Sequence, residues 1–501
     1  MLLRICLLSM LAAAGGPARA WAASAAGARA ELIEQYAGEL EQLAQQCDGR
    51  GLRDEAQRVR GWLLPQDPFK LSIPLVDTPS AGSGDVGQPP AASGDADWEQ
   101  EFARLRRQQA ERLWTLALEA ADQRRMSLAY SLVHEVLRED PQHGQARRLL
   151  GYKLHDGSWL TTFEQGKARS RQVWHDRFGW LPASHVERYE AGQRLYKGKW
   201  LAAEEEARLR TDIDRGWEVM TDHYLVRTNH SLEEGVRLAA RLEALYTAWR
   251  QVFVRFYLSD KQLEGLFRSG APAQTATRRH LVVYFRNRDE YTRALAARQP
   301  NIGISTGYYL AEDRKAYFFV VQPAEEESGP ASGAPAARDD TNVYHEATHQ
   351  LFSETKGGVR NPARDANFWV VEGIACYMES LVEGDGFCTL GGAQSVRLSD
   401  ARFRLLEDDF YVPLAQFSGF GVQTLQRDQR IAMLYSQAAG LAHFLMHYDQ
   451  GRYRDALVDY LLAIYSGRDR QSTLAELTST SFDELDRQYR EFVTATAAAA
   501  P

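Results

Sequence analysis

In the C-terminal half of this chain, the segments with a strand pattern come before the segments with a long helical pattern. His223–Asn229 and His280–Phe285 have the apolar patterns of β-strands, and a helical pattern runs between them from Leu232 to about Tyr257. Residues 306–322 predict a hairpin. The sequence from Thr341 to about Thr494 is mostly helical in pattern. Strands followed by helices predict an α+β fold for this half.

The length of the chain, 501 residues, predicts two to four folded units. Two segments rich in Gly, Pro, Ser and Ala, Thr78–Ala96 and Pro323–Asp340, interrupt it and have the composition of flexible stretches. We predict the following division: a signal peptide at 1–20, a helical segment at 21–66, a linker at 67–97, a helical segment at 98–150, a repeat region at 151–212 and the α+β domain at 213–497.

The first twenty residues combine Arg4, a short apolar run and an Ala-x-Ala ending at Ala20, which is typical of a secretory signal. We therefore expect an exported protein, either periplasmic or extracellular. No later stretch reaches the 18 apolar residues of a membrane span, so we expect no stable span after cleavage; an uncleaved N-terminal anchor is the alternative. The balance of 59 basic against 67 acidic side chains argues against a nucleic-acid partner.

Residues 98–150 place small residues and a closing Asp-Pro much as a tetratricopeptide (TPR) unit does, which indicates a surface for a protein partner, because one unit cannot bury its own face. A short repeat follows in three copies, each with a glycine and then Trp-Leu. Each copy predicts a glycine turn and then a helix start, such as Thr161 or Pro182. We expect the tryptophans to anchor turn to helix, and stacking on sugars or peptides is the alternative. The copies are Asp156–Glu164, Phe178–His185 and Lys197–Glu205.

Three cysteines remain after removal of the signal, Cys47, Cys376 and Cys388. Cys376 and Cys388 are close enough in sequence for a disulfide in an oxidising compartment, but sequence does not fix the separation of their Cα atoms. A disulfide and buried free thiols are therefore both open.

The helical half opens with His345-Glu346-Ala347-Thr348-His349. On a helix, positions i and i+4 share a face, so both imidazoles can reach one metal ion, with Glu346 beside the water bound to it. A catalytic zinc site needs a third protein ligand, and a carboxylate completes a His₂Glu set. Glu372, which lies 23 residues after His349, is the candidate. Glu379 lies on the same face of the predicted helix as Glu372 and is a candidate to accept a hydrogen bond from a ligating imidazole. The alternative is that Glu379 is a solvated surface acid.

These two segments, H-E-x-x-H and W-V-x-E-G-I-A-x-Y-x-E, resemble those of the gluzincin metallopeptidases. The similarity looks closest to an MA-like family of secreted bacterial proteins described only as a domain of unknown function, and it covers roughly residues 217–493. It implies a gluzincin-like peptidase domain preceded by a mainly helical, TPR-like region. It also implies one Zn²⁺ held by His345, His349 and Glu372, with a peptide or protein as substrate.

The resemblance further assigns roles in hydrolysis. Glu346 would be the general base, and Tyr435 lies in the register of the tyrosine that stabilises the oxyanion in aminopeptidase-N-like members. Gln437 and Ala438 stand where those members have Lys-Gly, and their G-A-M-E-N segment is not visible here, so the resemblance implies metal chemistry without aminopeptidase specificity. The strand around Gly307 would bind an extended peptide if it is the edge of the sheet.

Two histidines compete with Tyr435 for the oxyanion role, His443 and His447, on a predicted helix from Ile431 to about Tyr448. His443 is also a candidate to support the metal ligands, although a histidine on an apolar helix face is more often a core residue. Two other functions stay open for the whole protein: a catalytically idle metal-binding scaffold, and a glycan-binding protein that uses its tryptophans. The residue that separates a hydrolase from a structural metal site is Glu346.

Overall fold

The computed structural model describes residues 25–76, 96–270, 278–321, 341–356, 361–392 and 395–498. The expected signal peptide, most of the expected linker and the segment Pro323–Asp340 lie outside these residues. Within the described part, the chain forms two compact units. No helix in that part is both long enough and apolar enough to cross a membrane.

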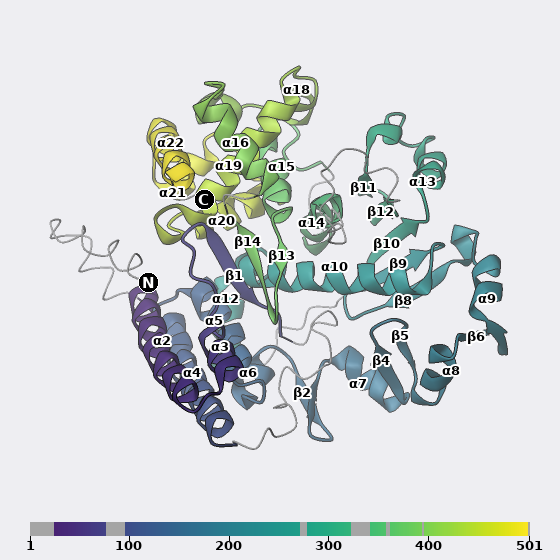
Figure 1. The fold of residues 1–501 in the computed structure, drawn as a ribbon. Coiled ribbons are helices and arrows are strands. Elements are labelled where there is room, and N and C mark those ends of the chain that lie inside the picture. Colours follow the sequence, from purple (N-terminus) through teal and green to yellow (C-terminus); the bar gives the residue numbers. More distant parts are fainter. Residues whose placement is uncertain are drawn as a thin grey trace. The chain divides into compact units, whose positions relative to one another are not determined.

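The first unit is helical and takes its described residues from 25–65, 96–159 and 258–270. Buried side chains from both sides of the expected linker, among them Tyr36 and Trp98, meet in one core. The segments predicted separately at 21–66 and 98–150 thus pack together. The helices, shown in Figure 1, are α2 (Ala25–Gly49), α3 (Arg53–Arg60), α4 (Ala96–Asp122), α5 (Met126–Glu139), α6 (Gly144–Leu149) and α12 (Asp260–Ser269).

A buried carboxylate links α5 to α2 and to the residues after α3. Glu139 accepts hydrogen bonds from Tyr36 Oη and Trp62 Nε1, each at 2.9 Å. The guanidinium groups of Arg106 and Arg138 lie 4.1 and 4.4 Å from the centre of the Trp62 indole ring, within cation–π range. Burial raises the pKa of Glu139, while the guanidinium of Arg138 opposes that effect. These contacts hold the two segments in one unit.

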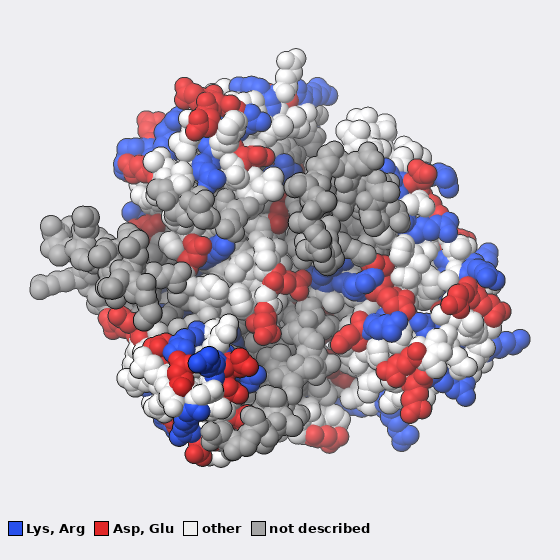
Figure 2. Space-filling model, in the orientation of Figure 1, with Lys and Arg blue, Asp and Glu red and all other residues white. Residues whose placement is uncertain are grey.

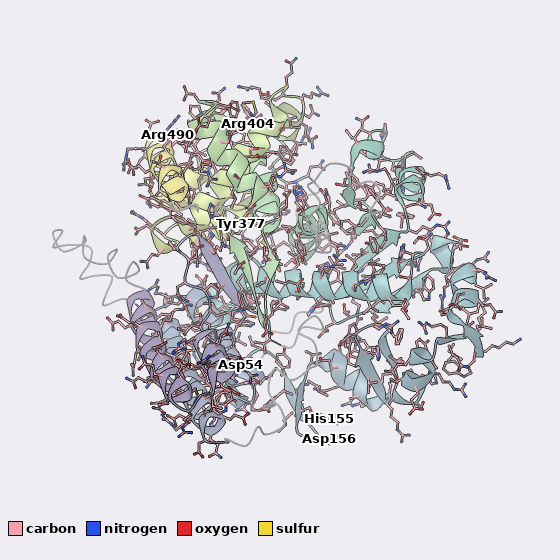
Figure 3. The ribbon with its side chains drawn as sticks, viewed as in Figure 1. Asp54, His155, Asp156, Tyr377, Arg404 and Arg490 are labelled. Carbon is pink, nitrogen blue, oxygen red and sulfur yellow. The ribbon has the colours of Figure 1, made fainter. Side chains whose placement is uncertain are left out.

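The three Trp-Leu repeats form three β-hairpins, each followed by a short helix. At the first tip, Asp156 (φ 49°) and Gly157 (φ 83°) both have positive φ, as a two-residue type I′ turn requires; His155 and Asp156 are labelled in Figure 3. Thr161 caps the following helix in a reciprocal capping box with Glu164, which confirms the predicted helix start. The hairpins are β2–β3 (Lys153–His155, Ser158–Leu160), β4–β5 (Gln172–His175, Gly179–Pro182) and β6–β7 (Gln193–Tyr196, Lys199–Ala202), and the helices are α7 (Thr162–Arg169), α8 (Val186–Glu190) and α9 (Ala203–Leu209).

The repeat tryptophans are half-buried, and those of the second and third copies pack on the preceding repeat. The ring centre of Trp180 lies 5.9 Å from that of Phe163, and the ring centre of Trp200 lies 5.0 Å from that of His185. Each ring therefore contacts the helical segment one repeat earlier in the chain. These contacts favour the anchoring role over exposed stacking platforms.

The second unit contains a five-stranded mixed sheet in the order β11-β12-β10-β9-β8. β9, β10 and β12 are parallel, and the two outer strands are antiparallel to their neighbours. The strand predictions at 223–229 and 280–285 and the hairpin at 306–322 are confirmed. The strands are β8 (Trp217–Met220), β9 (Tyr224–Thr228), β10 (His280–Phe285), β11 (Gly307–Leu310) and β12 (Lys315–Phe319).

Both faces of this sheet are covered. Val282 and Phe318 join the main core with α10 (Leu232–Val252) and α14 (Thr341–Thr355), whereas Tyr317 packs with Tyr291 of α13 (Arg288–Leu295) in a separate cluster. Successive residues of β12 thus face opposite layers, as the period of a strand requires. Mixed strands and helices agree with the predicted α+β class, and Figure 1 shows α10 running along the sheet.

Helices dominate after residue 341, but a second sheet interrupts them. β13 (Val382–Glu383) and β14 (Phe387–Gly391) pair antiparallel, and β1 (Lys70–Pro74) joins β14 from a distant part of the chain, with Ile73 opposite Cys388. The linker predicted at 67–97 is therefore wrong for residues 70–74, whose Ile73 is buried in the core. The helices after α14 are α15 (Phe368–Met378), α16 (Val396–Leu406), α17 (Leu414–Phe417), α18 (Val422–Gln426), α19 (Ile431–His447), α20 (Arg454–Tyr465), α21 (Thr473–Thr478) and α22 (Phe482–Ala498), and the short α11 (Val254–Tyr257) follows α10 earlier in the chain.

Surface charge is mixed on the face shown in Figure 2, where acidic and basic side chains of the described residues are interspersed. This distribution agrees with the near balance of 59 basic and 67 acidic residues in the sequence.

Candidate metal centre

Two histidines of α14 and one glutamate of α15 bring their side-chain donors together. The Nε2 atoms of His345 and His349 lie 3.1 Å apart, one helical turn from each other. Glu372 Oε2 lies 3.3 Å from His345 Nε2 and 3.6 Å from His349 Nε2. These three donor atoms form a group of the size that can hold one metal ion. Imidazole and carboxylate donors of this kind are the ligands of catalytic zinc.

A glycine lets α15 approach the helix behind it. A Cβ atom at Gly373 would lie 2.5 Å from the carbonyl oxygen of Ala438 on α19, so no larger residue fits without moving a backbone. Trp369 and Ile374 on the same helix are fully buried. This tight packing fixes α15 and directs the neighbouring Glu372 toward α14.

The electrostatics of the group favour a cation. Burial lowers the pKa of His345, but hydrogen bonds to Cys376, Glu372 and Glu379 outweigh it and hold that pKa well above the ordinary value. For Glu372, burial acts in the opposite direction and raises the pKa. The nearby His349 and His345 outweigh burial and keep the pKa of Glu372 well below its usual range. A buried site that draws a positive charge onto an imidazole is also suited to a divalent metal ion, so the residues present fit zinc.

A chain of hydrogen bonds continues behind His345. Its Nδ1 atom lies 2.7 Å from Glu379 Oε1, and the Nε of Arg397 on α16 donates to Glu379 Oε2 at 3.0 Å. The Glu379 side chain is only 3% exposed, so it is buried rather than a solvated surface acid. This pair of bonds fixes the orientation of the His345 ring. It leaves Nε2 facing His349 and Glu372, and these three residues are called the metal group below.

Glu346 faces the same cleft and is held by the sheet. Its Oε2 atom accepts a hydrogen bond from the backbone N–H of Tyr309 on β11 at 2.8 Å. Burial raises the pKa of Glu346, and the nearby His345 and His349 oppose this effect. A Cβ atom at Gly307 would lie 3.3 Å from Glu346 Cγ and 2.9 Å from Phe318 Cδ1, so glycine allows β11 to run close to α14.

Two tyrosines flank Glu372, Tyr435 of α19 and Tyr465 of α20, and both line the cleft. Burial and the Glu372 carboxylate raise the pKa of each phenol. Both phenols therefore keep their protons at neutral pH and can donate a hydrogen bond. Tyr435 is the one that the sequence singled out.

His443 and His447 are not part of this group. His443 Nε2 lies 2.9 Å from the carbonyl oxygen of Phe69, and His447 Nε2 lies 2.8 Å from Tyr377 Oη, a residue labelled in Figure 3. Burial lowers the pKa of His443 to about 4. Both are core histidines beside β1 and β14. Eight residues on a helix advance about 80° beyond two full turns, which turns His443 away from the face of Tyr435.

The three described cysteines, Cys47, Cys376 and Cys388, are buried and form no disulfide with one another. Cys376 Sγ lies 4.0 Å from His345 Nδ1, on the side where Glu379 binds. Burial raises the pKa of the Cys376 thiol, so it stays protonated and packs behind the imidazole.

The cleft that contains these side chains has a volume of about 610 Å³. Its walls come from β11, from the metal-group helices α14 and α15, and from α16, α18, α19 and α20. Sequence reasoning missed Arg397 and the backbone of Tyr309. Neither carries a motif: Arg397 lies 18 residues after Glu379, and every residue type offers the backbone N–H that Tyr309 uses.

Residues 340–468 are similar to a family described as "Protein of unknown function (DUF1570)". The matched segment contains α14, α15 and α19, and so includes all three members of the metal group and Tyr435. Its description carries no activity. A comparison with curated proteins gives no match.

Proposed function

We propose that this protein is an exported zinc-dependent metallopeptidase. The observation that carries the proposal is the convergence of His345, His349 and Glu372 in a cleft that also holds the Glu346 carboxylate. A structural zinc site is usually closed by four protein ligands, whereas three leave a position for water or substrate. A site that only binds metal has no use for Glu346, so its place in the cleft favours hydrolysis over an idle scaffold.

A zinc ion held by the three ligands would polarise the scissile carbonyl and lower the pKa of its bound water. Glu346, whose pKa is raised by burial, would accept a proton from the attacking water and deliver it to the leaving amine. Tyr435 would donate a hydrogen bond to the oxygen that gains negative charge. Glu379 would hold the tautomer and the orientation of His345 throughout.

The end position of β11 in its sheet supports a peptide as substrate. Because Tyr309 N–H donates to Glu346 rather than to β12, the backbone groups of Tyr309 point away from the neighbouring strand. The Tyr309 carbonyl is thus placed to accept a hydrogen bond from an extended peptide in the cleft. Ser305 Oγ already bonds to both backbone groups of Gly307, which limits the free edge to the stretch around Tyr309.

We also propose that residues 213–497 are gluzincin-like. The support is the order of the parts: a sheet that ends in β11, the helix with His345 and His349, the helix with Glu372 and the helix with Tyr435. The helix pair α4–α5 is proposed as a TPR-like site for a protein partner, on the sequence pattern described above.

Metal analysis and a peptide digest test the function together. Elemental analysis of the purified protein should give about one equivalent of zinc, and a combined His345→Ala and His349→Ala variant should lose it. A peptide library should be cleaved by the zinc-loaded protein and not after chelation. Unchanged zinc content in the double variant, or cleavage that survives chelation, would show that the site is misassigned.

A further inference from the structure

Two cations line the cleft among the described residues, Arg314 and Arg397, and their surroundings differ. Arg314 Nη2 lies 3.3 Å from Glu354 Oε2, and that carboxylate is only 2% exposed. Glu354 Oε2 also lies 3.1 Å from His280 Nδ1. Arg314 thus balances a buried carboxylate at the end of α14.

Arg397 is held at one edge of its guanidinium and is open at the other. Its Nε donates to Glu379 Oε2 at 3.0 Å, and Glu379 in turn binds His345. Within the described part of the chain, neither Nη atom of Arg397 donates a hydrogen bond, and the side chain is 37% exposed. The anchored Nε fixes the plane of the group, so Nη1 and Nη2 form an oriented fork.

The cleft offers this fork no carboxylate of its own. Of the acidic residues that line it, Glu346 accepts from Tyr309, Glu372 joins the metal group, and Glu354 pairs with Arg314. Glu312 is exposed on the β11–β12 turn. Asp400, one turn further along α16, acts on Arg397 electrostatically but makes no hydrogen bond to it among the described residues. Within the described part of the chain, the Nη atoms are thus left for a carboxylate of a molecule in the cleft.

We propose that Arg397 is a specificity residue that binds a carboxylate of the substrate. This inference rests on the proposed peptidase function. Arginine and a carboxylate can form two parallel charge-assisted hydrogen bonds, which favour that group over a neutral amide. The fork lies two hydrogen bonds from His345, and an extended peptide advances about 3.3 Å per residue, so the carboxylate lies about one to three residues from the cleaved bond. It is either the C-terminal carboxylate or an acidic side chain.

Binding tests this assignment without requiring turnover. The zinc-loaded Glu346→Gln protein is mixed with three coumarin-labelled hexapeptide libraries, and affinity is measured by fluorescence anisotropy. The first library lacks acidic residues and has a free C-terminal carboxylate, the second is the same library with a C-terminal amide, and the third is the amide with one Glu at varied positions. We expect one carboxylate library to bind about tenfold more tightly than the neutral one.

Substitutions at the two cleft arginines then locate the preference. Arg397→Gln should reduce the preference for the carboxylate library to less than twofold without weakening binding of the neutral library. Arg397→Lys, which keeps the charge but not the fork, should retain only part of that preference. Arg314→Gln, which removes one positive charge from the same cleft, should leave it intact. A preference for the free-acid library assigns the C-terminal carboxylate, and a preference for the Glu library assigns an acidic side chain.

Three results would overturn the proposal: no preference with Arg397 present, a preference that survives Arg397→Gln, or equal weakening of all three libraries. The last would mean that Arg397 acts only through Glu379. If the preference depends on Arg397 while the unsubstituted enzyme cleaves none of the peptides it binds, the carboxylate site stands and the peptidase function fails.

Discussion

Glu346 Oε2 accepts a hydrogen bond from the backbone N–H of Tyr309 at 2.8 Å, so the end strand of the sheet and the helix that carries His345 and His349 share one contact. The strand that we propose binds a peptide therefore also orients the carboxylate that we propose acts on that peptide. This coupling explains why Gly307 lies opposite Glu346: a side chain there would separate β11 from α14.

Gly307→Ala should lower kcat by about tenfold or more while zinc content stays at wild-type level. The new Cβ would lie 3.3 Å from Glu346 Cγ and 2.9 Å from Phe318 Cδ1, and a displaced catalytic group is costly. Steady-state kinetics and elemental analysis check this. Gly166→Ala is the matched control, because no heavy atom lies within 4 Å of its added Cβ. Equal kinetics for the two variants would contradict the role given to the Tyr309 contact.

Glu379→Gln should weaken zinc binding by about 10- to 100-fold, the usual cost of losing the carboxylate behind a ligating imidazole. Glu379 Oε1 lies 2.7 Å from His345 Nδ1. Competition with a coloured chelator measures the affinity. Glu354→Gln removes a comparable buried carboxylate that pairs with His280, outside the metal group, and should leave zinc affinity unchanged. If both substitutions weaken zinc binding to the same extent, the loss of any negative charge from the cleft is sufficient, and the hydrogen bond to His345 has no special role.

Tyr435→Phe should lower kcat by about 10²- to 10³-fold with little change in KM, as expected for a hydrogen bond made mainly in the transition state. Its phenol is protonated, because burial and Glu372 raise its pKa. Kinetics on one peptide, with Tyr465→Phe measured in parallel, decide between the two phenols. A loss confined to Tyr465→Phe, or a loss caused by His443→Ala with zinc retained, would reassign the role.

Acid should destabilise the fold through His443. Burial lowers its pKa to about 4, whereas an exposed histidine in the unfolded chain has a pKa of about 6.5. Between these values the unfolded chain binds the extra proton, so the free energy of unfolding falls as pH falls, by about 3 kcal/mol over the whole window. The free energy of unfolding of metal-free protein can be measured by urea denaturation at about pH 7 and pH 4. Its decrease between the two pH values should be smaller for His443→Gln than for wild type. The same loss in both proteins would contradict this assignment.

The parts of the fold that sequence predicts have local signals. The apolar run of β10, the hairpin of β11 and β12 and the start of α7 at Thr161 each lie within one segment, and the structure confirms them. The pairing of β1 with β14 has no such signal, because it joins residues that are about three hundred positions apart. Lys70–Pro74 is only a short strand and lies close to the Gly- and Pro-rich stretch that begins at Thr78, so no local signal separated it from the linker.

The candidate site divides in the same way. His345 and His349 share a helix face, and Glu372 lies in a distinctive segment, so spacing was enough to find them. Arg397 reaches the cleft only because α16 is folded back beside Glu379, which spacing does not indicate. His443 was a candidate because it shares a helix with Tyr435, but the packing of β1 and β14 on that helix places it in the core.

The most direct test of the account is the rate of peptide hydrolysis by Glu346→Gln, with the zinc content of the same sample measured. The amide keeps the shape of the side chain and removes the base, so we predict about one equivalent of zinc and a kcat that is about 10²- to 10⁴-fold below wild type. Glu354→Gln, which neutralises another buried carboxylate of α14, should retain both zinc and turnover. Near wild-type turnover by zinc-loaded Glu346→Gln would contradict the proposal that Glu346 is the base of a metallopeptidase.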